Sequence, residues 1–298
     1  MPNGRGAVSS PAEHEMATAI RTACVWEVTA RKVGNVHRYA DFAGSTYLDF
    51  VLSAGETADR LSSIPTGRIG EAILDAVRGT SRVVGNNTNL GIVLLLAPLA
   101  SSGTHRAELS TVLAKLSIED ARHVYEAIRV AAPGGLGDAP EQDVSEEPSV
   151  TLLEAMRLAA DRDMVARQYA NGFADVFDFG LPTLLAGVQR FGCIEAAIVD
   201  SQLRWLAEHP DSLIARKKGN AVALDVQKRA VEVLALGGIA TGEGRAAGVA
   251  LDRHLRSEGN KLNPGTTADL ITACLFVALR QNEVLPSSPF RWNVSDWL

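Results

Sequence analysis

Apolar residues recur at spacings of three and four along almost the whole chain, whereas the strict alternation typical of β-strands is scarce. Such spacing places apolar side chains on one face of an α-helix, where they can pack against a core. The pattern therefore predicts an all-α fold, a single globular domain of roughly ten helices. The expected helices span residues 12–31, 46–61, 69–77, 90–99, 117–131, 150–169, 181–189, 195–208, 222–236, 244–257 and 267–282.

Two segments are too polar to join this helical body. Residues 1–11 are rich in Gly, Ser and Pro, and we expect them to form a disordered tail before the helical domain at 12–298. Residues 138–149 are acidic, contain two prolines and have little to bury, which is typical of a loop. The helical pattern resumes unchanged beyond this acidic loop, so we favour a mobile loop over a domain boundary.

Composition narrows the class of protein. The 298-residue chain is 46% hydrophobic and 21% charged, which is ordinary for a globular protein with a sizeable core. Its formal net charge of −6 argues against a general binder of nucleic acid or anionic membranes. The three cysteines stand far apart without a C-x-x-C pair, which favours buried thiols in a reducing compartment. The most apolar run, 90–100, is too short to span a bilayer, and the N-terminus lacks a signal-peptide pattern. We therefore expect a cytoplasmic protein that binds neither nucleic acid nor membranes.

Two expected helix starts carry more polar residues than a helix needs. At 263–270 the run Asn-Pro-Gly-Thr-Thr-Ala-Asp-Leu places a rigid turn and two hydroxyls before an apolar helix, with Asp269 in its first turn. Exposed amides at a helix start bind anions, and Asp269 could hold the cation that a polyphosphate brings. The run Gly-Asn-Asn-Thr-Asn-Leu-Gly at 85–91 has the same character. Thr266, Thr267 or Asn89 could also be plain N-caps, but four polar residues at 86–89 exceed what capping requires. Together the two runs favour one pocket for a phosphorylated ligand.

The segment 27–39, where the first expected helix ends, is rich in cations. Lys32, His37 and Arg38 are suited to phosphate oxygens, and a guanidinium can bind them in two-pronged fashion. Compensation of the helix dipole explains Lys32 without a ligand. It does not explain Asn35 and His37, which lie beyond Gly34.

The segment 161–163, Asp-Arg-Asp, falls inside the expected helix at 150–169. Asp163 and Arg167 have the i,i+4 spacing of a surface ion pair. Asp161 instead shares a face with Gln168 on a mostly apolar stripe, and a carboxylate in such a place usually has a partner or a metal.

A third segment, 210–219, combines one acid with three consecutive cations. Asp211 is a good N-cap, and the cations suit a helix C-terminus. Equally, Arg216 and Lys217 could neutralise a triphosphate while Asp211 binds magnesium. No P-loop, dinucleotide-binding glycine motif, H-E-x-x-H or G-x-S-x-G motif is found in the sequence.

In order, these segments resemble the triphosphoribosyl-dephospho-CoA synthase family. The family's Glu followed by Pro-Lys-Pro-Gly-x-Val is similar to Glu27 and the run Arg-Lys-Val-Gly-Asn-Val at 31–36. Its Asn-Thr-His-Lys-Gly is similar to Asn-Thr-Asn-Leu-Gly at 87–91, and its Asp-Thr-Asn followed by an arginine resembles Asp211-Ser212 with Arg216. Its Ser-Pro-Gly-Gly-Ser-Ala-Asp-Leu-Leu, the most specific motif, is similar to 263–271. The resemblance covers most of the chain from about residue 17 onward.

The chain departs from this pattern at three places. Both prolines of the first motif are absent, and His37 stands where an acid usually follows the valine. The His-Lys of the second motif is Asn89-Leu90 here, which removes a cation from the expected phosphate site. The family's central glycine- and glutamate-bearing segment before Phe-Pro is replaced by 168–173 and 177–182. The chain therefore resembles a divergent branch of the family.

The resemblance implies an all-helical enzyme that transfers the 5-triphosphoribosyl unit of ATP to the ribose 2′-hydroxyl of dephospho-CoA, releases adenine and uses Mg²⁺. Substitution at an anomeric carbon needs a base, a donor for the leaving group and cations on the triphosphate. On this hypothesis Glu27, Asp211 and Asp269 hold magnesium or act as the base. The residues expected to bind substrate are Lys32, Asn35, His37, Arg38, Asn86, Asn87, Thr88, Asn89, Asp161, Gln168, Arg216, Lys217, Asn263, Gly265, Thr266 and Thr267.

Two other functions are compatible with the sequence. One is a ribosyl or phosphoribosyl transferase that makes a methanopterin- or methanofuran-type one-carbon cofactor, since branches of this kind occur in organisms that use such cofactors. The other is a helical protein that binds a nucleotide without turnover. The acceptor molecule, the identity of the base and the formation of a homo-oligomer stay open at this stage.

Overall fold

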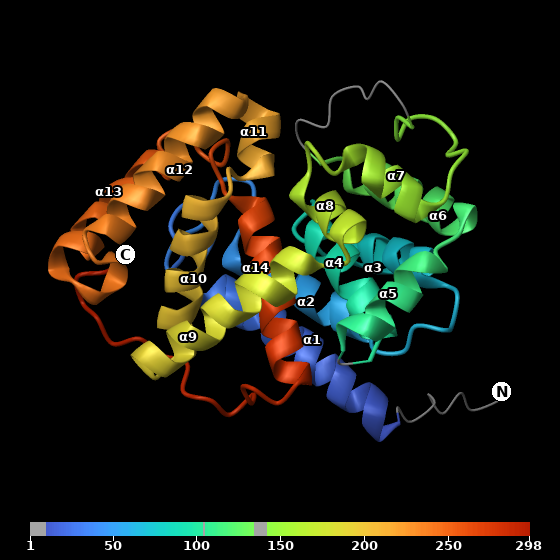
Figure 1. Ribbon diagram of the computed structural model, residues 1–298, viewed down its shortest axis with the longest axis horizontal. Coiled ribbons are helices and arrows are strands. Elements are labelled where there is room, and N and C mark those ends of the chain that lie inside the picture. Colours follow the sequence, from blue (N-terminus) through green and yellow to red (C-terminus); the bar gives the residue numbers. More distant parts are fainter. Residues whose placement is uncertain (1–9, 104, 134–141) are drawn as a thin grey trace.

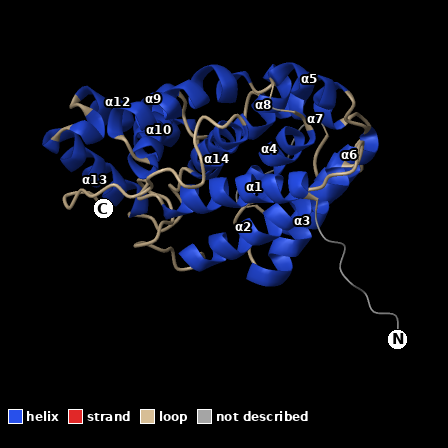
Figure 2. Cartoon of the chain, turned by 90° about the horizontal axis from the view of Figure 1, so that it is seen from below, coloured by secondary structure: helices blue, strands red, loops and turns tan. Residues whose placement is uncertain are grey.

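The computed structural model describes residues 10–103, 105–133 and 142–298, and it confirms the all-α prediction. These residues form fourteen α-helices and no β-strand. Figures 1 and 2 show the arrangement of these helices from two sides. The helices are α1 (Pro11–Thr29), α2 (Tyr47–Leu61), α3 (Ile69–Val84), α4 (Leu90–Ser101), α5 (Arg106–Ala114), α6 (Ile118–Ala131), α7 (Leu152–Ala159), α8 (Met164–Asn171), α9 (Leu181–Phe191), α10 (Ile194–Glu208), α11 (Ser212–Lys218), α12 (Asn220–Ala235), α13 (Gly242–Arg256) and α14 (Gly265–Arg280). A π-helical turn, η1 (Asp175–Gly180), precedes α9, and a 3₁₀ turn, η2 (Gly238–Ala240), precedes α13.

The predicted helix at 150–169 is the main error in the expected secondary structure. The chain leaves the helical conformation after α7 and begins again at α8, whose first amides are bonded by the side chain of Asp163. The helix α5 had not been predicted, and α11 had been considered only through the N-cap interpretation of Asp211. At the N-terminus α1 begins at Pro11, inside the predicted tail; residues 1–9 of that tail and 138–141 of the acidic loop lie outside the described residues.

Local sequence explains where several helices begin. Ser117 and Asp120 form the predicted capping box at the start of α6, and Ser10 with Glu13 forms another at α1. In such a box a hydroxyl and a carboxylate bond the free backbone amides of the first turn. Gly85 ends α3 in the left-handed conformation, φ 78°, which an L-residue adopts only at a cost. The turn that follows leads directly into the buried helix α4.

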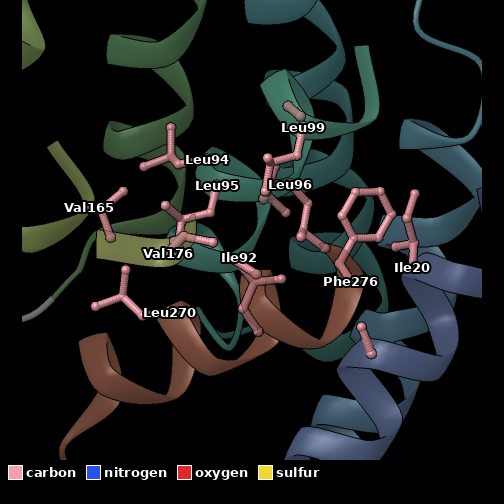
Figure 3. Packing of buried hydrophobic residues seen from close by; sticks show 14 of the residues in the cluster. Ile20, Ile92, Leu94, Leu95, Leu96, Leu99, Val165, Val176, Leu270 and Phe276 are labelled. Carbon is pink, nitrogen blue, oxygen red and sulfur yellow. The ribbon is translucent and has the colours of Figure 1, made fainter. Parts of the chain in front are cut away.

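The helix α14 lies at the centre of the molecule (Figure 1). All but four of its sixteen residues are buried, and it packs against α1, α4, α9 and α10. In Figure 3, Phe276 of α14 lies between Leu96 of α4 and Ile20 of α1. The uniformly apolar α4 is buried along most of its length, because other helices surround it on all sides. The start of α14 is thereby fixed relative to the ends of α1 and α3.

A second apolar cluster joins α10, α12, α13 and the C-terminal segment. A buried ion pair joins α10 to the end of α1: Arg31 Nε lies 2.8 Å from Oε1 of Glu195, which also pairs with Arg38. The Arg31 guanidinium donates to the backbone oxygens of Trp292, Val294 and Trp297. The indole of Trp297 donates in return to the backbone oxygen of Arg31. One arginine therefore holds residues far apart in the sequence.

The state of the cysteines agrees with the expectation from the sequence. All three cysteines are buried and free of disulfides, as predicted. Within the described ranges no helix has the length and the apolar character needed to cross a membrane.

Candidate functional site

A cavity of about 1250 Å³ opens where the end of α1 and the starts of α4, α11 and α14 face α6, α7 and α8. It exceeds the range of about 300–1,000 Å³ that is usual for small-molecule sites. Many of the residues that the sequence singled out line it, although they come from segments far apart in the chain. These are Glu27, Asn35, Asn86, Asn87, Thr88, Asn89, Asp161, Arg216, Lys217, Asn263, Gly265, Thr266 and Asp269.

Asp269 is the one of these side chains with the most unusual environment. Among the described residues it has no hydrogen bond and no ion pair, and its carboxylate lies against Gly91 in the first turn of α4. Burial, together with the carboxylates of Glu27, Asp211 and Asp163, raises the pKa of Asp269 well above its ordinary value. The carboxylate therefore lies in a region of negative potential that a cation or a proton would relieve.

Glu27 and Lys32 form a buried ion pair, with Nζ 3.0 Å from Oε1. The same ammonium donates to the backbone oxygens of Glu27 and Ala30, and Lys32 is only 1% exposed. Burial raises the pKa of Glu27 and lowers that of Lys32, although each partner opposes the effect on the other. The prediction that Lys32 binds phosphate is wrong in this geometry, because Lys32 is occupied in holding Glu27 at the cavity wall.

Asp211 does not line the cavity, and its carboxylate is fully bonded. Oδ1 accepts from the backbone nitrogens of Leu213 and Ile214 at the start of α11. Oδ2 accepts from the backbone nitrogen and the hydroxyl of Thr267, both at 2.8 Å. The N-cap interpretation is therefore correct, and Asp211 joins the starts of α11 and α14. Thr267 is occupied in the same way, so neither side chain is free to bind a substrate or a metal.

The predicted three-carboxylate magnesium centre is not formed. In the part of the chain that the structure describes, no three His, Cys, Asp or Glu side chains gather closely enough to hold a metal ion. Glu27 and Asp269 remain as carboxylates on the cavity wall, while Asp211 lies behind it.

Ser212 completes the junction between these helices. Its hydroxyl donates to Oγ1 of Thr266 at 3.1 Å and accepts from the backbone nitrogen of Met164 at 3.2 Å. The starts of α8, α11 and α14 are thus tied together at one edge of the cavity. Asn35 adds a further link, since its amide donates to Oδ1 of Asn263 at 2.5 Å.

The asparagine-rich turn before α4 uses most of its polar groups to hold neighbouring helices. The amide of Asn89 donates to the hydroxyls of Thr57 on α2 and Thr80 on α3. Thr88 shares a 2.5 Å hydrogen bond with Ser53, and Oδ1 of Asn87 accepts from the backbone nitrogen of Leu90. Asn89 stands at the N-cap position but makes no side-chain cap bond. Much of the polar excess is therefore structural.

Cations line the cavity as well: Arg162, Arg167, Arg216 and Lys217. Arg216 Nη1 lies 3.0 Å from Oδ2 of Asp163, while Nε of Arg216 is buried and has no hydrogen-bond partner in the described part of the chain. Lys217 donates to the backbone oxygen of Asn260 at 3.3 Å. Arg167 pairs with Asp175 at 3.0 Å, so the predicted pair of Asp163 with Arg167 is wrong. The break after α7 moves Asp163 to a cap position and turns it toward α11.

Four predicted substrate contacts lie away from the cavity or fit it poorly. His37 is buried, and its pKa falls to about 3 because of burial and of nearby cations, so at neutral pH it carries no charge. Arg38 is engaged with Glu195. Gln168 is fully buried and donates to Asp175 at 2.8 Å. Asp161 reaches the cavity but is exposed in the turn after α7, not on a buried stripe.

Sequence reasoning missed three cavity residues. Arg162 and Arg167 add positive charge to the cavity lining, but the continuous helix that had been expected placed them on unrelated faces. His209 also lines the cavity, with its ring 5.6 Å from that of Trp205 and 5.8 Å from that of Phe179. Only the position of His209 two residues before Asp211 could have pointed to it.

Gly91 offers a direct test of the position of Asp269. A Cβ at residue 91 would clash with Oδ2 of Asp269, a side-chain atom that can move. We expect Gly91→Ala to keep the thermal stability, since Ala favours a helix over Gly by about 1 kcal/mol, but to displace the carboxylate. Displacement of a reacting group by about 1 Å can lower a rate by up to ~100-fold, so turnover should fall at least about 10-fold.

The matched control for this variant is Gly55→Ala on α2. A Cβ at residue 55 would meet no atom within 4 Å, so this variant should retain both activity and melting temperature. Melting curves and initial rates measure the two effects, and full activity of Gly91→Ala would show that the carboxylate can be displaced without consequence.

Comparisons with known proteins agree with this arrangement. The family model described as ATP:dephospho-CoA triphosphoribosyl transferase matches residues 13–287. A protein of Pseudomonas putida described as a 2-(5''-triphosphoribosyl)-3'-dephosphocoenzyme-A synthase is 28% identical over 63% of this chain and 66% of its own length. A protein of the same description from Vibrio cholerae serotype O1 (strain M66-2) is 30% identical over 74% of this chain and 67% of its own length. The matched part of the chain thus spans about two thirds of these relatives.

A solved structure is also similar. The crystal structure of an Archaeoglobus fulgidus protein, described as a triphosphoribosyl-dephospho-CoA synthase, superposes with a TM-score of 0.60 and 27% identity. The superposition covers 77% of this chain and 97% of the other. Neither alternative function that the sequence left open is favoured by these relatives. The chain belongs to the ATP:dephospho-CoA triphosphoribosyl transferase family.

Proposed function

We propose that the protein transfers the 5-triphosphoribosyl group of ATP to the ribose 2′-hydroxyl of dephospho-CoA. The bond between C1′ of ATP and N9 of adenine breaks, and a bond from C1′ to the attacking oxygen forms. Adenine leaves with the bonding electrons and takes up a proton, while the hydroxyl loses one. The observation that carries the proposal is the Asp269 carboxylate, which has no partner among the described residues and shares one cavity with Glu27, Arg216 and Lys217.

The residues around Asp269 fit a magnesium ion. Mg²⁺ in nucleotide enzymes is usually bound through one or two carboxylates and the substrate phosphates, so a dedicated three-residue cage is not required. Asp269 lacks a partner and is surrounded by other carboxylates, and it would hold the ion together with the triphosphate. The ion would offset phosphate charge and orient the triphosphate.

Glu27 is the better candidate for the base that receives the hydroxyl proton. The ion pair with Lys32 fixes its position, and burial raises its pKa, which makes the carboxylate a stronger base. The transition state at C1′ has oxocarbenium character, so the nearby carboxylates also stabilise its positive charge.

Arg216 and Lys217 are the proposed triphosphate ligands, assisted by Arg162 and Arg167. The buried, unpaired Nε of Arg216 can donate to a phosphate oxygen without breaking an existing bond. Burial and the neighbouring Arg216 lower the pKa of Lys217, so a phosphate nearby would also favour its charged form.

Arg216→Met should weaken binding of Mg-ATP by about 10- to 100-fold, because a hydrogen bond to a charged group contributes about 1.5–3 kcal/mol. Isothermal titration calorimetry measures the change. The matched control is Lys218→Met, which removes the next cation but one; Lys218 pairs with Glu258 outside the cavity. Equal affinities of the two variants would remove Arg216 from the triphosphate site.

The reaction itself is tested by incubating the protein with ATP, magnesium and dephospho-CoA and measuring free adenine by chromatography. Adenine should appear only when all three are present, in equal amount to the triphosphoribosylated product. Absence of adenine at high enzyme concentration would refute the proposed function. The formation of a homo-oligomer stays a prediction.

A further inference from the structure

Among the described residues that line the cavity, His209 is the only histidine. Its imidazole has no hydrogen bond and no ion pair in the described part of the chain, and the residue is partly exposed. Phe179 and Trp205, whose rings pack against it, do not line the cavity. Of these three rings the imidazole alone can therefore reach a ligand, and its nitrogens are available to one.

The position of His209 is fixed by the end of α10 and by the π-helical turn η1. Its backbone nitrogen donates to the backbone oxygen of Trp205 at 2.9 Å, so His209 is the C-cap residue of α10. Phe179 of η1 stands edge-on to both rings, 4.9 Å from that of Trp205 and 5.8 Å from that of His209. A Cβ at Gly180 would clash with the Trp205 ring and with Sγ of Cys274, so this close packing requires glycine.

Charged groups around His209 act on its protonation in both directions. Burial lowers the pKa of His209; Asp175 in η1 and Glu208 on α10 oppose this effect, while Arg167 on α8 adds to it. The carbonyl end of α10 also favours a positive charge at its cap. The imidazole is therefore uncharged at neutral pH in the ligand-free protein, and the negative charge of a bound polyphosphate favours its protonated form. Once protonated, a buried imidazole is a stronger acid than histidine in water.

The proposed reaction needs a proton donor for the leaving base, and most other polar groups of the lining are unsuited to this role. The arginines keep their protons. Lys217 and the hydroxyl of Tyr125 each donate to a backbone oxygen, and burial raises the pKa of Tyr125. Glu27 is the proposed base and Asp269 the proposed magnesium ligand. His209 is the side chain of the lining best suited to donate.

The chain also keeps His209 close to the carboxylates. His209 lies two residues before Asp211, and two residues of extended chain span at most about 7 Å. Oδ2 of Asp211 accepts from the backbone nitrogen of Thr267, two residues before Asp269. In Figure 1, α10 and α11 both lie beside the central helix α14, against which each packs. The segment that carries His209 is thus fixed to the helix that carries Asp269.

We propose that His209 donates the proton that the departing adenine takes up. This inference rests on the proposed function and assigns a donor to it. As the bond between C1′ and N9 breaks, its electron pair moves to adenine, and a ring nitrogen of the base takes the proton from the imidazolium. The acceptor hydroxyl gives its proton to Glu27, so one proton leaves the protein and one enters it. Exchange with water then restores both groups.

His209→Ala should lower kcat for adenine release at least about 100-fold, since a general acid contributes about 10²–10⁴-fold to a rate. KM for ATP should change less than about threefold, because the phosphate ligands are retained. Added imidazole should restore part of the lost rate, since it can enter the space that the side chain leaves. The wild-type kcat should fall as pH rises and the imidazolium is lost, and the variant should lack this fall.

Two further variants keep the test decisive. His209→Gln retains a hydrogen-bond donor of similar size but has no acidic proton to give, so it should be as slow as His209→Ala. His105→Ala removes an exposed histidine at the start of α5, outside the cavity, and should be as fast as the wild type. Melting curves check the fold of each variant. If either variant of His209 is folded and keeps more than about one tenth of kcat, His209 is not the donor.

A measurement without turnover separates this inference from the proposed function. The imidazole signals of His209 in nitrogen-15 magnetic resonance spectra are identified by their absence from His209→Ala. Mg-ATP should shift them more than Mg-tripolyphosphate does, because tripolyphosphate brings the charge without the base. Equal shifts would refute the contact with adenine, whatever the activity. A larger shift with Mg-ATP in a protein that releases no adenine would support the contact while the proposed function fails.

Discussion

Asp269→Asn is expected to lower the rate of adenine release by at least about 100-fold, the usual effect of removing one electrostatic contact to a transition state. It should also weaken Mg-dependent ATP binding, since the proposed magnesium ligand is lost, while helical circular dichroism is unchanged. Glu27→Gln should instead lower turnover with Mg-ATP affinity retained, because Glu27 is proposed to act as the base. The exposed Asp75, which lies outside the cavity, supplies the control: Asp75→Asn should change neither property.

Asp269→Asn should also raise the free energy of unfolding of the ligand-free protein at neutral pH. Burial and nearby carboxylates raise the pKa of Asp269, so the folded protein holds this proton more tightly than the unfolded chain does. The stabilisation is complete below the unfolded-state pKa of about 3.9 and is lost as pH rises through the raised folded-state pKa. Asparagine avoids that loss, and each kcal/mol recovered corresponds to about 2–4 °C in melting temperature.

Melting curves of Asp269→Asn and the wild type at pH 4 and pH 7.5, without nucleotide, test the direction of this pH dependence. The advantage of Asp269→Asn over the wild type should be clear at pH 7.5 and should disappear toward pH 4. A wild type that is more stable than the variant at pH 7.5 would mean that the carboxylate has a stabilising partner, and would contradict its proposed environment.

Arg31→Met should have the largest effect on folding, a loss of about 3–5 kcal/mol in the free energy of unfolding. The substitution leaves the buried Glu195 with only Arg38 as a charged partner and frees three backbone oxygens of the C-terminal segment. Urea denaturation measures the loss. Arg21→Met, which breaks an exposed pair with Asp59, should cost about 1 kcal/mol or less.

The urea midpoints of Arg31→Met and Arg21→Met decide whether the buried network stabilises the fold. If Arg31→Met unfolds at the same urea concentration as Arg21→Met, the buried network contributes no more than a surface pair. Loss of the C-terminal segment without global unfolding would appear as early protease cleavage beyond Pro289, with the midpoint of the main transition unchanged.

Local sequence was sufficient for the helical class and for several helix ends. Hydroxyl and acid three residues apart predicted the start of α6, because both partners of that cap are local. The break between α7 and α8 was missed because the sequence pattern around Asp163 is compatible with two structures. An aspartate there can be an exposed residue within one long helix or the N-cap of a new helix. The choice depends on Arg216, which lies 53 residues away along the chain.

The sequence indicated which segments line the candidate site, but it did not indicate what the individual side chains of these segments bind. The polar runs before α4 and α14 do meet at one cavity, since both helices pack in the same core. The partners of each polar group are set by tertiary contacts: Lys32 with Glu27, Asp211 with Thr267, and Asn89 with two threonines. The sequence shows that a side chain is suited to bind phosphate. It does not show that the same side chain is already paired with another residue of the protein.

The position of Asp211 between two helix starts affects how its variants must be interpreted. Four hydrogen bonds from one carboxylate fix α11, which carries Arg216 and Lys217, relative to α14, which carries Asp269. Replacing this aspartate would shift Arg216 and Lys217, the proposed phosphate ligands, away from Asp269, the proposed metal ligand. Loss of activity in an Asp211 variant would therefore report misalignment of α11 and α14. It would not show that Asp211 takes part in breaking or forming a bond.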